Sequence, residues 1–311
     1  MPLDTQIQAM LEEAAALRLP ALQTLTVEEA RARELAGIDL TIGEAVARVE
    51  NRDIPGPSDP IPLRLYWPQG TGPFPLLVYF HGGGFVLGNV DTHDALCRTL
   101  TNEARCLTIS VDYRLAPEHQ FPAAVEDCFA ATMWAAAHAA EIGGDSGRIA
   151  VGGNSAGGNL AAVVSQRARD QGGPLLVYQW LIYPVLAPPG TTPSYQENAE
   201  GYRLPRELMH WLWNQYLPDR ILDRDPQAAS LQAADLHHLP PALIVTAGYD
   251  PLRDEGELYA QRLRQADVPV RLVCYDSMIH GFFGYAAAHP GARDALLDAA
   301  TSLRAALHAA C

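Results

Sequence analysis

The fold of this chain is decided by the stretch Ile149-Ala150-Val151-Gly152-Gly153-Asn154-Ser155-Ala156-Gly157-Gly158-Asn159-Leu160-Ala161. Its first three residues are apolar, as in a buried strand, and its last residues begin a helical stretch. Between them, glycines flank Ser155 in the pattern G-x-S-x-G, so that neighbouring backbone can approach without a β-carbon in the way. The stretch therefore predicts a strand, a strained turn that carries Ser155, and a helix.

Apolar runs and helical segments alternate along most of the chain. The runs that we interpret as strands buried on both faces span 76–80, 106–111, 149–151, 175–183, 242–247 and 270–275. Helical segments lie near 93–104, 122–139, 158–169, 255–266 and 293–307. Two runs of alternating polarity, 45–49 and 61–67, are typical of antiparallel strands. This order predicts an α/β fold with a mostly parallel, eight-stranded sheet flanked by helices.

Two other regions interrupt this pattern and predict a helical cap. Residues 1–42 contain an apolar repeat at helical spacing that ends at Pro20, then a capping box formed by Thr26 and Glu29. Residues 186–234 form a Pro-rich insertion with an amphipathic helix over 205–217. We therefore expect residues 1–42 and 186–234 to form the cap, and residues 43–185 and 235–311 to form the catalytic domain.

The composition excludes several classes of partner. The 311 residues carry a formal net charge of −14, and all 22 basic residues are arginine. An acidic surface repels phosphate backbones and anionic membrane surfaces, so we expect no nucleic-acid partner and no membrane insertion. Because lysine is absent, a catalytic lysine is excluded. The sequence is compatible with a homodimer but does not indicate one.

The cysteines and the N-terminal residues predict a cytoplasmic protein. The five cysteines (Cys97, Cys106, Cys128, Cys274 and Cys311) are scattered, which argues against a disulfide framework and against a zinc cluster. The first residues lack the basic and apolar regions of a secretory signal. No apolar run reaches the roughly 18 residues of a membrane span.

A glycine-rich loop follows the predicted strand 76–80. It reads His81-Gly82-Gly83-Gly84-Phe85 and leaves backbone N–H groups facing the carboxyl edge of the sheet. Such groups can bind an oxyanion, and we assign this role to Gly83 and Gly84, with Ala156 as the third donor. A phosphate-binding loop is the alternative, but the G-x-G-x-x-G spacing and a following lysine are both absent.

A serine nucleophile needs a base, and the base needs a carboxylate that orients it. In the strand–turn–helix context of Ser155 these groups follow in the order acid, then histidine. His280 is the histidine that closely follows a strand in a short loop, so it is the predicted base. Asp250 directly follows the preceding strand and is the predicted acid. Asp254 is the alternative, although its position suits the start of a helix better.

These motifs together resemble those of the bacterial hormone-sensitive-lipase-like carboxylesterases (family IV esterases) of the α/β-hydrolase fold. The resemblance covers about residues 62–280. It rests on five motifs in order: His81-Gly82-Gly83-Gly84, Tyr113-Arg114-Leu115-Ala116-Pro117-Glu118, the Ser155 turn, Asp250-Pro251-Leu252-Arg253-Asp254 and His280-Gly281-Phe282. It implies hydrolysis of small-molecule esters with short to medium acyl chains, without a cofactor or a metal.

The resemblance has one departure and leaves several roles as expectations. Asn154 stands where the family commonly has Asp, and we expect altered local hydrogen bonding there without loss of activity. His81 is expected to be structural. Arg114 and Glu118 are expected to form a buried pair that holds the loop after the strand 106–111.

The substrate pocket is the least constrained part of the prediction. Leu204, Leu208 and Leu212 share one face of the cap helix and are candidates for the acyl pocket, as are Phe85 and Phe282 beside the glycine loop and the base. Packing of the three leucines on the catalytic domain is the alternative. An interfacial lipase, or a non-catalytic ligand-binding protein on the same scaffold such as the plant gibberellin receptors, is the alternative function.

Overall fold

The computed structural model describes residues 1–38, 43–190 and 192–309. Its centre is an eight-stranded sheet in the order β1-β2-β4-β3-β5-β6-β7-β8. The first pairs, β1–β2 and β2–β4, are antiparallel and all others are parallel. The strands are β1 Arg48–Ile54, β2 Ile61–Trp67, β3 Phe74–Phe80, β4 Leu107–Val111, β5 Gly144–Asn154, β6 Leu176–Ile182, β7 Ala242–Tyr249 and β8 Val270–Ile279.

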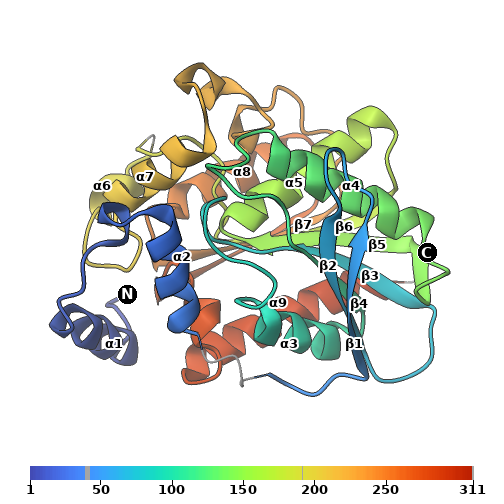
Figure 1. Ribbon diagram of the computed structural model, residues 1–311, viewed down its shortest axis with the longest axis horizontal. Coiled ribbons are helices and arrows are strands. Elements are labelled where there is room, and N and C mark those ends of the chain that lie inside the picture. The colour runs from blue at the N-terminus through green and yellow to red at the C-terminus, as the bar shows by residue number, and fades with distance from the viewer. Residues whose placement is uncertain (39–42, 191, 310–311) are drawn as a thin grey trace.

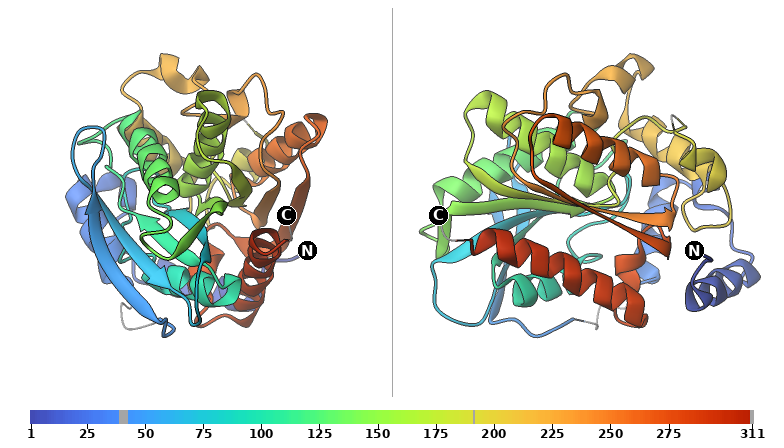
Figure 2. Two further views of the ribbon diagram at one scale, coloured as in Figure 1. Left: turned by 90° about the vertical axis from the view of Figure 1, so that its right-hand side faces the viewer. Right: turned by 180° about the vertical axis from the view of Figure 1, so that it is seen from behind.

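Helices cover both faces of the sheet (Figures 1 and 2). One face carries α3 (Asp94–Ala104) and α9 (Pro290–Leu307), and the other carries α4 (Ala123–Ala137), α5 (Ala156–Gln171) and α8 (Arg253–Gln265). Side chains alternate along β3, so that Leu76, Val78 and Phe80 enter one core and Leu77 and Tyr79 enter the other. This two-sided burial explains the near-continuous apolar runs and confirms the predicted fold class.

Besides the short η4 (Phe282–Tyr285), which follows β8, the remaining helices lie over one end of the sheet (Figure 1). They are α1 (Thr5–Ala16), the short η1 (Leu22–Thr24) and α2 (Val27–Ala36) from the N-terminal region, and α6 (Ser194–Glu197), α7 (Arg206–Tyr216), η2 (Arg220–Arg224) and η3 (Ser230–Gln232) from the insertion after β6. The capping box of Thr26 and Glu29 is present as predicted. The proposed domain boundary after residue 42 and residue 191 of the insertion lie outside the described residues.

The first strand is displaced from its predicted position. The sequence pattern places it over residues 45–49, whereas β1 spans Arg48–Ile54 and pairs with β2 from Arg48 opposite Trp67 to Ile54 opposite Ile61. This strand lies at the sheet edge and is mostly exposed; even Val49 is 38% exposed. An exposed edge strand needs little apolar surface, so its hydrophobic pattern is weak.

Candidate active site

Ser155 lies in a strained turn between β5 and α5. Its φ is 56° and its ψ is −119°, a conformation that L-residues rarely adopt. The amide N–H of Ser155 donates to the Ile182 carbonyl oxygen at 2.8 Å, which attaches the turn to β6. A β-carbon at Gly157 would overlap the carbonyl group of Phe80. The glycine therefore permits β3 and the first turn of α5 to come together beside Ser155.

Ser155, His280 and Asp250 form a hydrogen-bonded chain. His280 Nε2 lies 3.0 Å from Ser155 Oγ, and His280 Nδ1 lies 2.8 Å from Asp250 Oδ2. All three residues are buried. With the Nδ1 proton donated to the carboxylate, Nε2 is free to accept the hydroxyl proton. This arrangement meets the geometric requirements of a nucleophile, a base and an orienting acid.

Two turns at the carboxyl ends of neighbouring strands position the acid and the base. Asp250 follows β7 and its Oδ1 accepts the Leu252 N–H at 2.8 Å, so the turn itself orients the carboxylate. His280 follows β8, and the ring of Tyr183 meets its ring edge to face with centroids 4.8 Å apart. The alternative acid, Asp254, instead accepts the Ser194 N–H at 2.8 Å and lies in the first turn of α8.

The glycine loop presents backbone amides beside Ser155. Gly83 has a φ of 120° and Gly84 a φ of 62°, conformations that favour glycine. Among the described residues, neither amide N–H has an acceptor, and Ala156 is the first residue of α5, where the amide has no partner within the helix. A β-carbon at Gly84 would overlap the side chain of Leu212, so the cap helix α7 packs directly on this loop.

Asn154 joins the serine turn to the glycine loop. Its Oδ1 accepts the Gly82 N–H at 3.0 Å and the Tyr79 hydroxyl at 2.5 Å. The side chain is thus engaged with β3 and the glycine loop, and the expectation that Asn in place of Asp alters local hydrogen bonding stays a prediction. Motif analysis could not find this link, because the residues are more than seventy positions apart.

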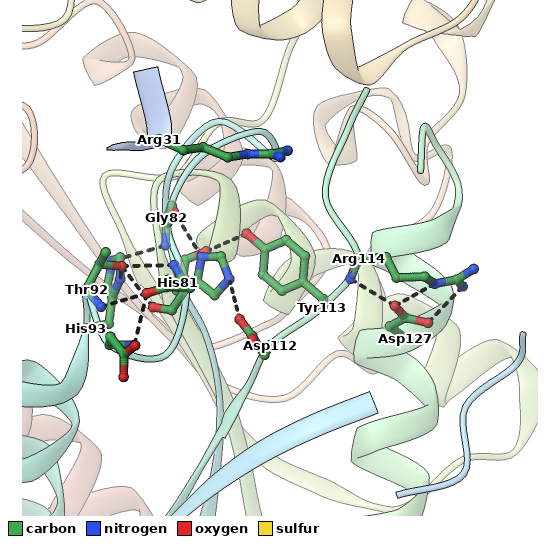
Figure 3. Close-up of polar contacts among 12 residues, drawn as sticks. Arg31, His81, Gly82, Thr92, His93, Asp112, Tyr113, Arg114 and Asp127 are labelled. Carbon is green, nitrogen blue, oxygen red and sulfur yellow. Dashed lines mark hydrogen bonds and ion pairs between the residues drawn. The ribbon is translucent and has the colours of Figure 1, made fainter. Parts of the chain in front are cut away.

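His81 lies beneath the glycine loop (Figure 3). Its ring stacks on Tyr113 with centroids 4.2 Å apart, and its Nδ1 lies 2.8 Å from the Gly82 carbonyl oxygen. The Tyr113 hydroxyl donates to the His81 carbonyl oxygen at 2.8 Å. Burial lowers the pKa of His81 to about 4, so the ring is neutral at pH 7. These contacts give His81 a supporting position under the loop.

The expected buried pair of Arg114 and Glu118 is wrong. Arg114 pairs with Asp127 of α4, with its Nη2 2.8 Å from Oδ1, as Figure 3 shows. Glu118 is about half exposed and binds both terminal nitrogens of Arg31 at 2.8 Å. Arg31, from α2, also donates to the carbonyl oxygens of Val86 and Ala116. The sequence motif holds both residues, but Arg114 pairs with the next helix along the chain, and Glu118 pairs with a helix 87 positions away.

The candidate pocket residues are largely covered by other side chains. Phe282 has no exposed surface and packs in the core between Tyr183 and Tyr275, so it cannot line an open pocket; this expectation is corrected. Phe85 stacks on Tyr216 of α7 with centroids 3.8 Å apart. The side chains of Leu204, Leu208 and Leu212 are buried in the same core cluster. This packing agrees with the alternative that these residues hold the cap on the catalytic domain.

The cap is also attached to the acid turn and to the start of α8. Asn198 donates to the Asp250 carbonyl oxygen at 3.1 Å, and Ser194 donates to the Pro251 carbonyl oxygen at 2.5 Å. Glu255 is fully buried and its Oε2 accepts the amides of Leu186 and Ala187, at 2.6 and 2.9 Å, where the insertion leaves β6. No sequence motif singles out any of these three polar residues.

The other reactive groups in the described residues are buried or dispersed. Cys97, Cys106 and Cys128 are buried free thiols, and Cys274 is partly buried and also free. Burial raises the pKa of Cys106 to about 12, so this thiol stays protonated. Cys311 lies outside the described residues.

Within the described ranges we find no group of His, Cys, Asp and Glu suited to a metal ion, and no helix long and apolar enough to cross a membrane.

Known proteins resemble this chain along most of its length. A family model described as alpha/beta hydrolase fold matches residues 77–284. The carboxylesterase NlhH of Mycobacterium tuberculosis is 42% identical over 306 residues, which cover 96% of this chain and 95% of that protein. The esterase LipI of the same organism is 46% identical over 265 residues, 84% of this chain and 83% of LipI.

Solved structures agree over almost the whole chain. The hyperthermophilic esterase of Pyrobaculum calidifontis superposes with a TM-score of 0.94 at 43% identity and covers 98% of this chain and 99% of its own. A thermostable esterase from Pseudomonas putida gives a TM-score of 0.95 at 36% identity and covers 99% of both chains.

Proposed function

Because the chain belongs to the hormone-sensitive-lipase-like carboxylesterases of the α/β-hydrolase family, we propose that it hydrolyses small-molecule carboxylic esters through Ser155, His280 and Asp250. The observation that carries the assignment of these residues is the hydrogen-bonded chain from Ser155 Oγ through His280 to Asp250. The relatives are named esterases or carboxylesterases, which supports ester hydrolysis as the reaction.

In the proposed mechanism, Ser155 Oγ attacks the ester carbonyl carbon while its proton passes to His280 Nε2. Asp250 holds the imidazole and stabilises its charged form. His280 then donates the proton to the leaving alkoxide, and an acyl group remains on Ser155. A water molecule, deprotonated by His280, attacks this acyl-enzyme and releases the carboxylic acid. This scheme uses no metal and no cofactor.

The oxyanion of each tetrahedral intermediate is assigned to the amides of Gly83, Gly84 and Ala156. Unpaired amides beside the nucleophile need no reorganisation when negative charge develops. Loss of one such donor raises a barrier by about 3 kcal/mol. The positive end of the α5 dipole adds to this stabilisation because Ala156 begins that helix.

The cap, proposed as residues 1–42 and 186–234, sets the acyl-chain limit in this scheme. Leu212 lies against Gly84, and Leu208 lies one turn earlier on α7. We infer that these side chains bound the space above the glycine loop, so that short to medium acyl groups are preferred. A series of 4-nitrophenyl esters from C2 to C12 tests this: rising activity up to C12 with activation at a lipid interface would instead indicate a lipase.

The replacement Ser155→Ala tests the nucleophile. We expect kcat on 4-nitrophenyl acetate to fall at least about a thousandfold, because no other group replaces the hydroxyl. The matched control is Ser165→Ala, on the same helix, whose hydroxyl donates to the Ala161 carbonyl oxygen at 2.8 Å away from the turn. The assignment fails if Ser155→Ala keeps most of its activity while both variants fold.

The cytoplasmic location and a homodimer remain parts of this proposal. Cell fractionation tests the first, and sedimentation equilibrium of the purified chain tests the second.

A further inference from the structure

Arg203 is a basic residue of the cap that lies against the histidine turn. A β-carbon added to Gly281, the residue after His280, would lie 3.2 Å from a terminal guanidinium nitrogen of Arg203. The same group donates to the Tyr285 hydroxyl at 3.0 Å and lies over the Tyr285 ring, 5.1 Å from its centroid. The guanidinium is therefore held beside the predicted base by two contacts.

The backbone at Arg203 is strained. Its φ is 63°, and the Leu204 N–H donates to the Tyr202 carbonyl oxygen at 2.7 Å, which closes a three-residue turn around Arg203. A residue with a β-carbon adopts this conformation at an energetic cost. The strain is a reason to ask what this side chain does at that position.

The charge of Arg203 acts on both sides of the proposed reaction centre. Burial raises the pKa of Tyr183, whose ring meets His280, and the charge of Arg203 opposes this increase. Burial lowers the pKa of His93 to about 3, and Arg203 adds to this decrease. His93 Nε2 lies 3.3 Å from the Gly82 amide, at the glycine loop. The charge of the guanidinium therefore reaches one group beside His280 and one group beside the glycine loop.

Among the described residues, the guanidinium of Arg203 has a hydrogen bond to the Tyr285 hydroxyl and free donors beside it. A guanidinium carries five N–H donors. Among the described residues, its hydrogen-bond partner is the Tyr285 hydroxyl, and no carboxylate lies within ion-pair distance. Burial raises the pKa of Glu34 of α2, the nearby acid, while the bond from the Gly88 amide and the charge of Arg203 oppose this. The Arg203 side chain is exposed, so a ligand can reach it.

We propose that Arg203 binds a carboxylate in the alcohol portion of the ester, so that the preferred substrates are O-acyl derivatives of small hydroxy acids. This inference rests on the proposed function, because His280 gives its proton to the leaving alcohol and thereby places that portion beside Gly281. A guanidinium fork pairs with a carboxylate through two parallel hydrogen bonds. On a protein with a net charge of −14, a local cation is needed to hold an anionic substrate.

The test compares acetoxyacetate with its neutral isostere acetoxyacetamide, by acetate release at pH 7.5. In Arg203→Leu, we expect the ratio of kcat/KM for the anion to kcat/KM for the amide to fall about fivefold or more. Arg203→Lys keeps the charge but loses the fork, so its ratio should lie between those of the wild type and Arg203→Leu. In the wild type, 0.5 M NaCl should reduce the ratio because salt screens an exposed ion pair.

Two controls distinguish binding of the anion by Arg203 from a general effect of charge in the cap. Arg220→Leu makes the same charge change in the cap at an ion pair with Asp223, and should leave the ratio unchanged. Monomethyl succinate carries its carboxylate in the acyl portion, and its kcat/KM relative to the neutral amide should not depend on Arg203.

Several outcomes would overturn the inference. Equal losses of kcat/KM for acetoxyacetate and acetoxyacetamide in Arg203→Leu would indicate a purely structural side chain. A selective loss of kcat/KM for monomethyl succinate would show that Arg203 binds a carboxylate in the acyl portion instead of the alcohol portion. A wild type that cleaves 4-nitrophenyl acetate but has no Arg203-dependent preference refutes this inference alone. A wild type inactive on every ester refutes the proposed function itself.

Discussion

The floor of the site and the cap above it are built in different ways. The floor comprises the turns at Ser155, Asp250 and His280 and the glycine loop, and backbone hydrogen bonds and close backbone contacts hold it. The proposed cap is attached by apolar packing of α7 on the glycine loop and by single polar side chains that reach across the chain, such as Arg31 and Asn198. The floor therefore depends on residues that permit close approach, whereas the cap depends on side-chain packing and on a few long-range polar partners.

This difference predicts different responses to mutation. A change in the floor moves the reacting atoms themselves, and a misplacement of about 1 Å costs about a hundredfold in rate. A change in the cap removes an attachment but leaves Ser155 and His280 in place. The cap should therefore tolerate loss of a contact with a moderate effect on stability and on substrate binding.

Among the changes that compare the floor with the cap, the largest effect is expected from Gly157→Ala in the floor. The new β-carbon would overlap the Phe80 carbonyl group, so backbone must shift beside Ser155. We expect about 3 kcal/mol of destabilisation and a kcat about a hundredfold lower, measured by denaturant unfolding and by ester hydrolysis. The control is Gly37→Ala at the end of α2, where a β-carbon meets its nearest atom at an ordinary 3.4 Å. Equal behaviour of the two variants would remove the distinction between floor and cap.

An intermediate effect is expected where the insertion leaves β6, at the point where Glu255 accepts the amides of Leu186 and Ala187. Burial raises the pKa of Glu255 to about 8, although the two amide bonds oppose this; Tyr195 and Asp250 are the ionisable groups that act on it. An acid whose pKa is raised in the folded state stabilises the folded protein fully at pH values below its unfolded pKa of 4.5. This stabilisation is lost as the pH rises through about 8.

Glu255→Gln removes this titration and keeps an oxygen for the two amides. Relative to the wild type, the variant should gain stability between pH 5 and pH 9 by a few kcal/mol, levelling off above about pH 8. Thermal or denaturant unfolding at pH 5, 7 and 9 measures the difference. Unfolding free energies that run parallel across this pH range would show that Glu255 does not titrate there.

The smallest effect is expected from Arg31→Ala in the cap. It removes the bonds from α2 to Val86, Ala116 and Glu118, and we expect a loss of about 1–2 kcal/mol, with kcat/KM reduced more than kcat. Arg33→Ala is the matched control, because its guanidinium binds the Pro20 carbonyl oxygen within the cap itself. If Arg31→Ala abolished kcat, α2 would belong to the floor.

The floor was largely predictable from local sequence. The strand and helix around Ser155 have clear periodicity. The turn between them needs glycine because a β-carbon would block the close approach of the backbone, and the glycines are visible in the sequence. The order of Asp250 and His280 after consecutive strands then brings both to the edge that carries Ser155, since parallel strands end together. The edge strand β1 is displaced because exposure weakens its apolar pattern.

The partners of charged residues were not predictable. Arg114 and Glu118 are four positions apart and belong to one motif, yet they bind Asp127 and Arg31 respectively. Phe282 follows the histidine turn closely but points into the core. In each case the direction of a side chain depends on which other element packs beside it.

The fold class, the order of the strands along the chain and the residues of the serine, acid and histidine turns can be predicted from the sequence, because each follows from local periodicity and from the steric needs of the backbone. The attachment of the proposed cap is visible in the folded protein alone, as are the bond from Gly82 to Asn154 and the position of Arg203 beside Gly281. Those contacts join residues that are far apart in the chain, and their formation depends on packing that no local pattern encodes.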